Sequence, residues 1–365
     1  MTDTLDAPFV IDIAAPPVLQ PAQYVIGARS LLMDRAVPLP EILVIPPRRS
    51  QESHLTLSYD GRPGKLEPTG SWKRQLSERV KLAKRPGKGV PILDLRPIGP
   101  NNWSHALNIA FPLALMVRDR FRDAGLPDPV FVCPGKMSGR IVELFERFDL
   151  TVLCTSGAVK GAVIVADPVD PNEQVLAHFR DWIAPHADGM RALIAEGAGE
   201  IPDRVFLDRR DGRTLANGDA VRGFLEDRGF STIYPEDLSL AQQCALLCTP
   251  SQIVAIHGAG IAPLMFRQPG AGPFRFVEIL TPGHMTVYFK KFTDGLPADY
   301  RMLRGRPTAK MSAAAYDLTT SFADYAGAFS LAPFEVDLST LNLALGPEPI
   351  ETMLTSGEPL EYADL

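Results

Sequence analysis

The residues that best combine reactive chemistry with informative spacing form a glycine-rich turn, His257-Gly-Ala-Gly260. The turn follows the short apolar run 253–256, which predicts a strand covered on both faces. Glycine permits a sharp turn, and the first N–H groups of a helix that starts there lack partners and attract anions such as phosphate. We therefore predict an anion-binding turn. The alternative is that the glycines serve packing alone and that His257 is an ordinary core or capping residue.

Three arginines lie close together after another predicted strand, at Arg209, Arg210 and Arg213. Guanidinium groups at this density repel one another unless a bound anion or nearby carboxylates compensate their charge. Because arginine can bind two phosphate oxygens at once, a diphosphate is a fitting ligand for this loop. The alternative is that the arginines pair with the carboxylates of Asp208 and Asp211.

Two further side chains have types suited to the same chemistry. Glu278 lies near the end of the predicted strand 274–280, where its carboxylate could accept hydrogen bonds from a ribose, although a solvated strand-end acid fits equally well. His105 follows a predicted strand and a proline-containing turn, at the start of a predicted helix. Histidine can remove a proton from a sugar hydroxyl near neutral pH, but a purely structural histidine fits this place too.

Strands and helices alternate along both halves of the chain. The first half has predicted strands at 90–95, 130–133, 151–154 and 162–166, with helices at 101–123 and 138–148. The second half has predicted strands at 204–208, 231–234, 251–256 and 274–280, with helices at 217–228 and 238–248. Such alternation is typical of parallel β-α-β units, and open parallel sheets bind ligands at the carboxyl ends of their strands. We expect an α/β protein with two Rossmann-type halves that face an interdomain cleft.

Composition limits the classes of function. The 365 residues carry a formal net charge of -6, which argues against a protein that coats nucleic acid. The sequence lacks an Asp-x-Asp pair for a metal, a Gly-x4-Gly-Lys-Ser/Thr loop and an early Gly-x-Gly-x-x-Gly motif. These absences argue against a kinase, a P-loop nucleotidase and a standard dinucleotide oxidoreductase. The four cysteines are expected to be buried free thiols.

Hydropathy and charge also bear on location. No apolar stretch has the length of a membrane span, and the first residues do not resemble a signal peptide, so we expect a cytoplasmic protein without a transmembrane segment. The most basic stretch, residues 73–89, is either a solvated surface or a peripheral contact for a membrane or an anionic acceptor.

The motifs of the second half occur in a recognisable order. They are Asp208-Arg-Arg210, Arg213, Asn217, Gly229-Phe230, Tyr234-Pro-Glu236, Leu238-Ser239, Gln243, His257-Gly-Ala-Gly260, Phe266, Pro269-Gly270 and Val277-Glu278. In this order and spacing the chain resembles glycosyltransferase family 61, the DUF563 or capsular polysaccharide biosynthesis type. Asn102-Trp-Ser-His105 is similar to the family's N-terminal Asn-x-x-His motif, whereas Pro263 stands where the family often has asparagine.

The resemblance implies a GT-B-like fold and an inverting glycosyltransferase without an essential metal or other cofactor. Its substrates would be a nucleotide-diphosphate sugar and a glycan or lipid-linked acceptor, in cell-surface or capsular polysaccharide synthesis. Residues 1–190 would form the acceptor-side domain. Independently of the resemblance, the prolines of residues 1–40 predict an irregular N-terminal arm, and the apolar residues of 41–46 and 54–59 predict two strands that form an edge hairpin or added sheet. Residues 191–310 would bind the nucleotide sugar. Residues 311–365, with a helix at 312–329, could pack back on the first domain.

The charge that develops on a leaving diphosphate would be stabilised by Arg209 or Arg210, by Arg213 and by the backbone N–H groups of 258–260. Catalytic roles are predicted for His105 as the base and for Arg210 and His257. Donor binding is predicted for Arg209, Arg213, Asn217, Glu236, Gln243, Gly258, Ala259, Gly260 and Glu278. One alternative is a non-catalytic GT-B-like protein that binds glycan or an assembly partner, and another is a GT-B-type sugar-nucleotide epimerase or hydrolase. The motifs do not define the donor base and sugar, the acceptor, the linkage or the oligomeric state.

Overall fold

The computed structural model describes residues 5, 7–30, 38–70, 75, 83–87, 89–168, 171–199, 201–283, 286–308, 311 and 330–348. The chain divides into two compact units: unit 1 comprises residues 1–18 and 49–192, and unit 2 comprises residues 19–48 and 193–365. Each unit contains parallel strands with helices between them, so the expected α/β class is confirmed. The predicted helix 312–329 and most of the basic stretch 73–89 lie outside the described residues.

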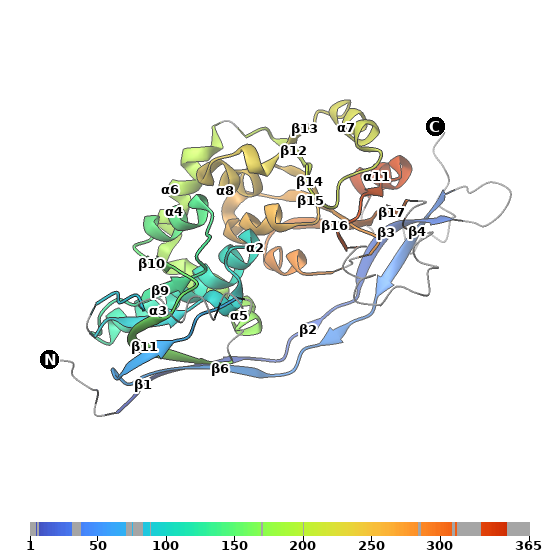
Figure 1. Ribbon diagram of the computed structural model, residues 1–365. Helices are drawn as coiled ribbons and strands as arrows, with labels where there is room; N and C mark the ends of the chain where they lie inside the picture. Colours follow the sequence, from blue (N-terminus) through green and yellow to red (C-terminus); the bar gives the residue numbers. More distant parts are fainter. Residues whose placement is uncertain are drawn as a thin grey trace. The chain divides into compact units, whose positions relative to one another are not determined.

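Unit 1 is built on a mixed sheet (Figure 1). Its strands are β1 (Phe9–Ala15), β6 (Ser53–Tyr59), β7 (Pro63–Leu66), β8 (Pro91–Asp94), β9 (Val130–Cys133), β10 (Thr151–Cys154) and β11 (Val159–Asp167). Their order is β1-β6-β11-β8-β9-β10, and β7 pairs with β11. β11, β8, β9 and β10 run parallel, as the alternation of strands and helices predicts, whereas β1 and β6 add antiparallel strands.

The helices of unit 1 connect these parallel strands. They are η1 (Arg96–Ile98), α2 (Trp103–His105), η2 (Ala106–Ala110), α3 (Phe111–Asp123), α4 (Gly139–Arg147), α5 (Asn172–Ile183), η3 (Ala184–His186) and α6 (Ala187–Ala198), which extends past the limit of the unit. α2, η2 and α3 follow one another without a break and occupy the predicted helix 101–123. Asn102 caps this segment, because its side-chain oxygen accepts a hydrogen bond from the N–H of Ser104 at 2.9 Å.

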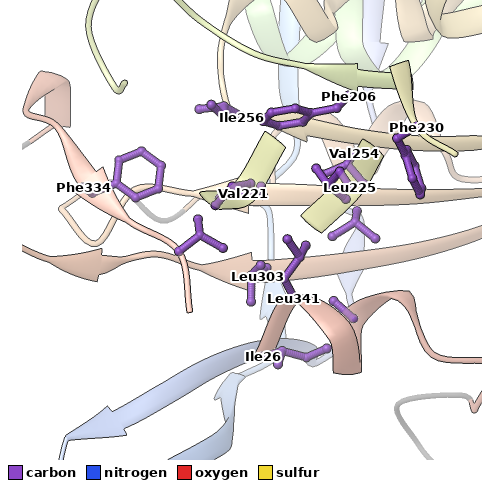
Figure 2. Packing of buried hydrophobic residues seen from close by; sticks show 14 of the residues in the cluster. Ile26, Phe206, Val221, Leu225, Phe230, Val254, Ile256, Leu303, Phe334 and Leu341 are labelled. Carbon is purple, nitrogen blue, oxygen red and sulfur yellow. The ribbon is translucent and has the colours of Figure 1, made fainter. Parts of the chain in front are cut away.

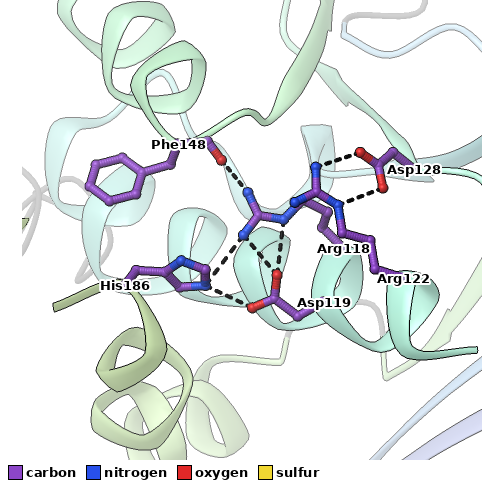
Figure 3. A network of polar contacts seen from close by, with 6 residues as sticks. All are labelled: Arg118, Asp119, Arg122, Asp128, Phe148 and His186. Atoms are coloured by element: carbon purple, nitrogen blue, oxygen red, sulfur yellow. Dashed lines mark hydrogen bonds and ion pairs between the residues drawn. The ribbon is translucent and has the colours of Figure 1, made fainter. Parts of the chain in front are cut away.

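A buried arginine ties α3 to its surroundings within unit 1 (Figure 3). The side chain of Arg118 donates to the carbonyl oxygen of Phe148 and forms an ion pair with Asp119 at 2.7 Å. Asp119 also contacts Nε2 of His186 at 2.7 Å. Because a buried cation needs both a counter-charge and hydrogen-bond acceptors, these contacts fix α3 and the helical segment that leads into it.

Unit 2 contains a seven-stranded sheet with the order β13-β12-β14-β15-β16-β3-β4. Its strands are β3 (Gln23–Ser30), β4 (Pro38–Ile45), β12 (Arg204–Leu207), β13 (Ser231–Ile233), β14 (Gln252–Ile256), β15 (Phe274–Leu280) and β16 (Ala298–Arg304). All neighbours from β13 to β3 run parallel, and β4 is antiparallel to β3. β17 (Arg306–Pro307) and β18 (Phe334–Glu335) form a small separate pair. Two further two-residue strands are β2 (Leu19–Gln20) and β5 (Arg48–Arg49).

Short helices connect the strands of unit 2. They are α7 (Gly218–Glu226), η4 (Pro235–Asp237), α8 (Leu240–Cys248), η5 (Ala259–Phe266), η6 (Pro269–Ala271), η7 (Phe289–Phe292) and α11 (Leu338–Leu345). The helix after the glycine-rich turn, η5, is a 3-10 helix. It contains Pro263, whose ring nitrogen has no N–H to donate, which disfavours a regular α-helix at this position.

One face of the sheet in unit 2 packs into a hydrophobic core (Figure 2). Alternate residues of neighbouring strands supply it, including Val254 and Ile256 of β14 and Val277 and Ile279 of β15. Each fully buried aliphatic side chain contributes about 1.5–3 kcal/mol. Because side chains of a strand alternate between its faces, Glu278 must lie on the face opposite this core. The core therefore fixes the strand ends at which the predicted site residues lie.

The structure corrects one prediction of strand pairing. Strands 41–46 and 54–59 do not form a hairpin, because β4 pairs with β3 in unit 2 whereas β6 pairs with β1 and β11 in unit 1. Alternation of apolar residues shows which face of a strand is buried but does not identify its partner. All four cysteines are free, as expected, and Cys133, Cys244 and Cys248 are buried. Over the described part of the chain, the helices are too short or too polar to span a membrane.

Candidate functional site

The glycine-rich turn lies at the carboxyl end of β14, in the middle of the sheet of unit 2. The N–H of His257 donates to the carbonyl oxygen of Ile279 at 2.8 Å, so the turn is anchored to β15. Gly258 is buried and extended, and a Cβ atom added to it would lie 1.7 Å from Nη1 of Arg209. A Cβ atom on Gly260 would lie 3.1 Å from Pro235. Both glycines therefore allow close approach, and at Gly258 the neighbour is a cationic side chain.

Two arginines of the loop after β12 meet at this turn. Nη1 of Arg209 and Nη1 of Arg213 donate to the same atom, the carbonyl oxygen of His257, at 3.3 and 3.1 Å. Burial and the charge of Arg209 lower the pKa of Arg213, because both disfavour its cationic form. Asp211 pairs with Arg209 only at 3.5 Å from an almost fully exposed position, where an ion pair contributes little.

The position of Arg213 is held from a distant part of the sequence. Its φ angle of 58° lies in the left-handed region, which is uncommon for a residue other than glycine. Its backbone N–H donates to the carbonyl oxygen of Leu331 at 2.8 Å, and Nε donates to that of Ser330 at 2.8 Å. Residues 330–331 therefore over-determine the conformation that aims this guanidinium at the turn.

Arg210 points elsewhere. Its guanidinium forms two hydrogen bonds of 2.7 Å with the carboxylate of Asp237 and lies 4.0 Å from the ring centroid of Tyr234. Glu236 lies at 3.7 Å from the same guanidinium. The side chain of Arg210 is 52% exposed. The predicted catalytic arginine is thus part of a surface ion cluster together with the predicted donor-binding Glu236.

The aspartate before the arginines pairs with a residue that the sequence did not suggest. Asp208 is buried, and its carboxylate accepts hydrogen bonds from Arg222 of α7 at 2.6 Å and from the hydroxyl of Tyr234 at 3.2 Å. The backbone N–H of Arg209 donates to the same carboxylate at 2.8 Å. Asp208 therefore holds the loop through the backbone N–H of Arg209. The guanidinium of Arg209 does not pair with this carboxylate and instead contacts the turn.

Two predicted donor-binding residues use their amide groups inside the protein. Asn217 donates from Nδ2 to the carbonyl oxygen of Val336 at 2.7 Å, and the N–H of Val336 donates back to its Oδ1 at 3.0 Å. Gln243 is buried and donates to the carbonyl oxygen of Pro235 at 2.6 Å. Gln243 thus holds the segment that packs on Gly260.

Glu278 contacts two side chains from the flanking strands. Its Oε1 lies 2.5 Å from Nδ1 of His257, and its Oε2 accepts a hydrogen bond from the hydroxyl of Tyr300. The carboxylate is fully buried. Burial and the neighbouring carboxylate raise the pKa of Tyr300 well above its usual value, so the phenol remains a hydrogen-bond donor. This geometry favours a role in holding His257 over the predicted contact with a ribose.

His105 lies in unit 1, at the end of α2. Its side chain is exposed, and Nδ1 lies 2.9 Å from the carbonyl oxygen of Ile98. Because a carbonyl oxygen only accepts hydrogen bonds, Nδ1 carries the proton in this contact, and the lone pair of the neutral ring is then on Nε2. Gly99, whose φ angle of 70° is left-handed, turns the chain between Ile98 and the helix. In this contact Nε2 is therefore the ring nitrogen that can accept a proton.

The structure brings together part of the predicted site. His257, Gly258, Arg209 and Arg213 meet at one turn, and Glu278 holds the ring of the histidine. Tyr300 and Arg222 are not among the residues predicted from the sequence. Tyr300 could have been found from the pairing of β15 with β16, because alternate residues of adjacent strands lie on the same face of a sheet. This was not possible from the sequence, since β16 was not predicted as a strand.

Comparison with known proteins places this geometry in a family. Among curated proteins, none matches the chain. The family model described as Glycosyltransferase 61 matches residues 32–273, a range that contains both the arginine loop and the turn at His257. Since the match extends over more than half of the chain and includes the residues that meet at the turn, the protein belongs to the glycosyltransferase 61 family.

Proposed function

We propose that the protein is an inverting, metal-independent glycosyltransferase with a GT-B-like fold. It moves a sugar from a nucleotide-diphosphate donor to a hydroxyl group of a glycan or lipid-linked acceptor. The membership of the glycosyltransferase 61 family supports the reaction class. The donor diphosphate binds at the turn of unit 2.

The observation that carries this proposal is the convergence of Arg209 and Arg213 on the carbonyl oxygen of His257. Their two Nη1 atoms can be no farther apart than the sum of their distances to that oxygen. At an effective dielectric constant of about 20, two unit charges so placed repel by on the order of 2–3 kcal/mol. A hydrogen bond to a neutral carbonyl returns only about 0.5–1.5 kcal/mol. A bound anion with at least two negative charges resolves this imbalance.

The same arrangement fits the chemistry of transfer. The acceptor oxygen forms a bond to the anomeric carbon while the bond from that carbon to the diphosphate oxygen breaks, and the acceptor's proton passes to a base. Negative charge grows on the departing diphosphate, where Arg209, Arg213 and the backbone N–H groups of 258–260 can stabilise it. His105, with its lone pair on Nε2, is the proposed base.

A panel of nucleotide sugars tests the proposal and identifies the donor. Each compound is added to the full chain, and the thermal transition is followed. A donor present at 100 times its dissociation constant stabilises the folded state by about 2.7 kcal/mol. We expect one base and one sugar to raise the transition and to support transfer to an added glycan. If no compound in the panel raises it, the protein is not a donor-dependent transferase and the non-catalytic alternative is favoured.

The products separate the remaining alternative. A sugar-nucleotide hydrolase or epimerase would release nucleotide or a changed sugar in the absence of an acceptor, whereas a transferase releases the nucleoside diphosphate only as the acceptor is consumed. A role in cell-surface or capsular polysaccharide synthesis, a cytoplasmic location, and membrane contact through residues 73–89 stay predictions. Of residues 73–89, the structure describes only 75, 83–87 and 89.

A further inference from the structure

Three side chains form a chain of hydrogen bonds across three neighbouring strands of unit 2. In the sheet register, Glu278 of β15 pairs with Ala255 of β14 and with Met302 of β16. His257 is two positions after Ala255, and Tyr300 is two positions before Met302. Side chains two positions apart on a strand point to the same face of the sheet. His257 and Tyr300 therefore lie on the same face as Glu278, as its diagonal neighbours. Parallel pairing thus brings together three residues that are far apart in the sequence.

The hydrogen bonds in this chain have a defined direction. Tyr300 donates to Oε2 of Glu278, because its phenol keeps its proton. The carboxylate is left as an acceptor, and Nδ1 of His257 donates to Oε1 over 2.5 Å. In a neutral ring the lone pair is then on Nε2, and in a charged ring Nε2 carries a second proton that it can donate. The ring of Phe289, with its centroid 5.3 Å away, packs against the imidazole and limits its rotation.

His257, at one end of this series of hydrogen bonds, is also the residue whose carbonyl oxygen both arginines contact. The ring of His257 is held by Glu278, and its carbonyl oxygen accepts hydrogen bonds from Arg209 and Arg213. A change in the orientation of the ring is therefore expected to shift the carbonyl oxygen that Arg209 and Arg213 contact. The negative charge of Glu278 also acts to raise the pKa of Arg213, against the larger effects of burial and of Arg209, which lower it.

We propose that Tyr300 is a positioning residue that acts through Glu278 to hold the ring of His257, with its proton on Nδ1, at the turn that binds the diphosphate of the donor. For the identity of the ligand this inference rests on the proposed function. Tyr300 itself does not touch the substrate. Its hydroxyl occupies the second carboxylate oxygen, so that Glu278 cannot turn away from the histidine.

The test compares the wild type with Tyr300→Phe, which removes only the hydroxyl. The matched control is Tyr59→Phe, which removes the hydroxyl of a buried tyrosine in unit 1. Two quantities are measured on the full chain: the ¹⁵N chemical shifts of the ring nitrogens of His257, identified by their loss in His257→Gln, and the affinity for inorganic pyrophosphate. The shifts report which nitrogen carries the proton, a property that a purely structural role of Tyr300 would not change.

We expect Tyr300→Phe to move the His257 signals and to weaken pyrophosphate binding about 10-fold to 100-fold, as for loss of a hydrogen bond to a charged group. Tyr59→Phe should change neither. Unchanged His257 signals in Tyr300→Phe would overturn the proposal. If that variant does not fold, Glu278→Gln, which keeps the shape of the carboxylate but removes its charge, takes its place with the same two readouts and the same criterion.

The two measurements also separate this inference from the function on which it rests. If the wild type does not bind pyrophosphate while the His257 signals respond to Tyr300→Phe, the diphosphate site fails and only the positioning of the ring stands. If pyrophosphate binds with equal affinity to the wild type and to Tyr300→Phe, the diphosphate site stands, and the link from Tyr300 to the ligand is refuted.

Discussion

Arg209 and Arg213, four positions apart on one loop, donate hydrogen bonds to a single carbonyl oxygen, that of His257. The chain leaves β12 just before Arg209 and returns to the sheet only at β13, so the loop lies at the carboxyl end of the parallel strands. This relationship brings two cationic side chains together at the proposed diphosphate site.

Replacing Arg213 by Ala should lower turnover by about 10²–10³-fold, since one donor to the developing charge is lost. Affinity for the nucleoside diphosphate product should fall as well. The matched control is Arg204→Ala, at the opposite end of β12, where the exposed side chain donates to the carbonyl oxygen of Arg228. Steady-state kinetics and calorimetry of all variants check this. Equal losses for Arg204→Ala and Arg213→Ala would contradict the site.

Arg210→Ala should cost less than Arg213→Ala, because Arg210 binds Asp237 and stacks on Tyr234 instead of approaching the turn. The sequence-based prediction gave Arg210 the catalytic role. The same kinetic comparison decides between the two, and a larger loss for Arg210→Ala would restore that prediction.

Gly258→Ala should displace Arg209 from the turn. The added Cβ atom would lie 1.7 Å from Nη1, at the free end of a long side chain that can move aside. The extended backbone of Gly258 tolerates alanine, so the thermal transition should change little while affinity for the nucleoside diphosphate falls. Gly270→Ala is the control, because its added Cβ atom would meet nothing within 4 Å. Unchanged affinity in Gly258→Ala would mean that Arg209 does not contribute.

Asn217→Ala should destabilise unit 2. The substitution removes both hydrogen bonds to the backbone of Val336, which is expected to lower the free energy of unfolding by about 1–3 kcal/mol. Chemical denaturation measures this, with Asn342→Ala as a control, since that amide has one exposed contact with Arg228. Lost donor binding with unchanged stability would instead support the predicted donor contact of Asn217.

His105→Ala should suppress turnover by about 10²–10⁴-fold while affinity for the nucleotide donor survives, because a general base acts in the reaction step. His178→Ala is a suitable control, since that ring stacks on Trp182 within α5. Single-turnover kinetics and donor titration separate the two effects. Normal turnover in His105→Ala would remove it as the base.

Asp128 should contribute acid-sensitive stability to unit 1. Arg122 donates to both of its carboxylate oxygens at 2.9 and 2.7 Å, which lowers the pKa of Asp128 (Figure 3). The contribution is complete above the unfolded pKa of about 3.9 and is lost as the pH falls through the lower folded value. Denaturation of the wild type and Asp128→Asn should therefore give a constant difference above about pH 5 that shrinks below about pH 4. A difference independent of pH would refute this, and Arg122→Met should abolish the pH dependence.

Much of the fold could be predicted from the sequence. The predicted strand 274–280 coincides with β15, and those before the arginine loop and the glycine-rich turn differ from β12 and β14 by a single residue. Buried parallel strands consist of short apolar runs, and the length and β-branched residues of these runs favour a strand over a buried helix. The arginine loop and the turn directly follow such strands, and the carboxyl ends of parallel strands lie at the same end of a sheet. It was therefore predictable that the loop and the turn would meet there.

The rest depends on pairings that no local pattern encodes. β16 contains the polar residues Asp299, Tyr300 and Arg301 in succession, so it lacks the continuous apolar run of a buried parallel strand. Its partner on one side, β3, comes from the opposite end of the sequence. The role of Tyr300, the pairing of Asp208 with Arg222 and the anchoring of Asn217 all arise from such distant contacts.

The placement of β3 and β4 in the second sheet has a consequence for how the protein can be made and divided. Residues 19–48 emerge from the ribosome long before β16, on which β3 pairs. During synthesis β3 can pair with β4, but its other side has no partner until β16 has been made. A fragment that starts at residue 193 would lack them and would expose β16 as a new sheet edge, which invites association with other chains. Unit 2 should therefore be soluble only when residues 19–48 are supplied, in the same chain or as a separate peptide.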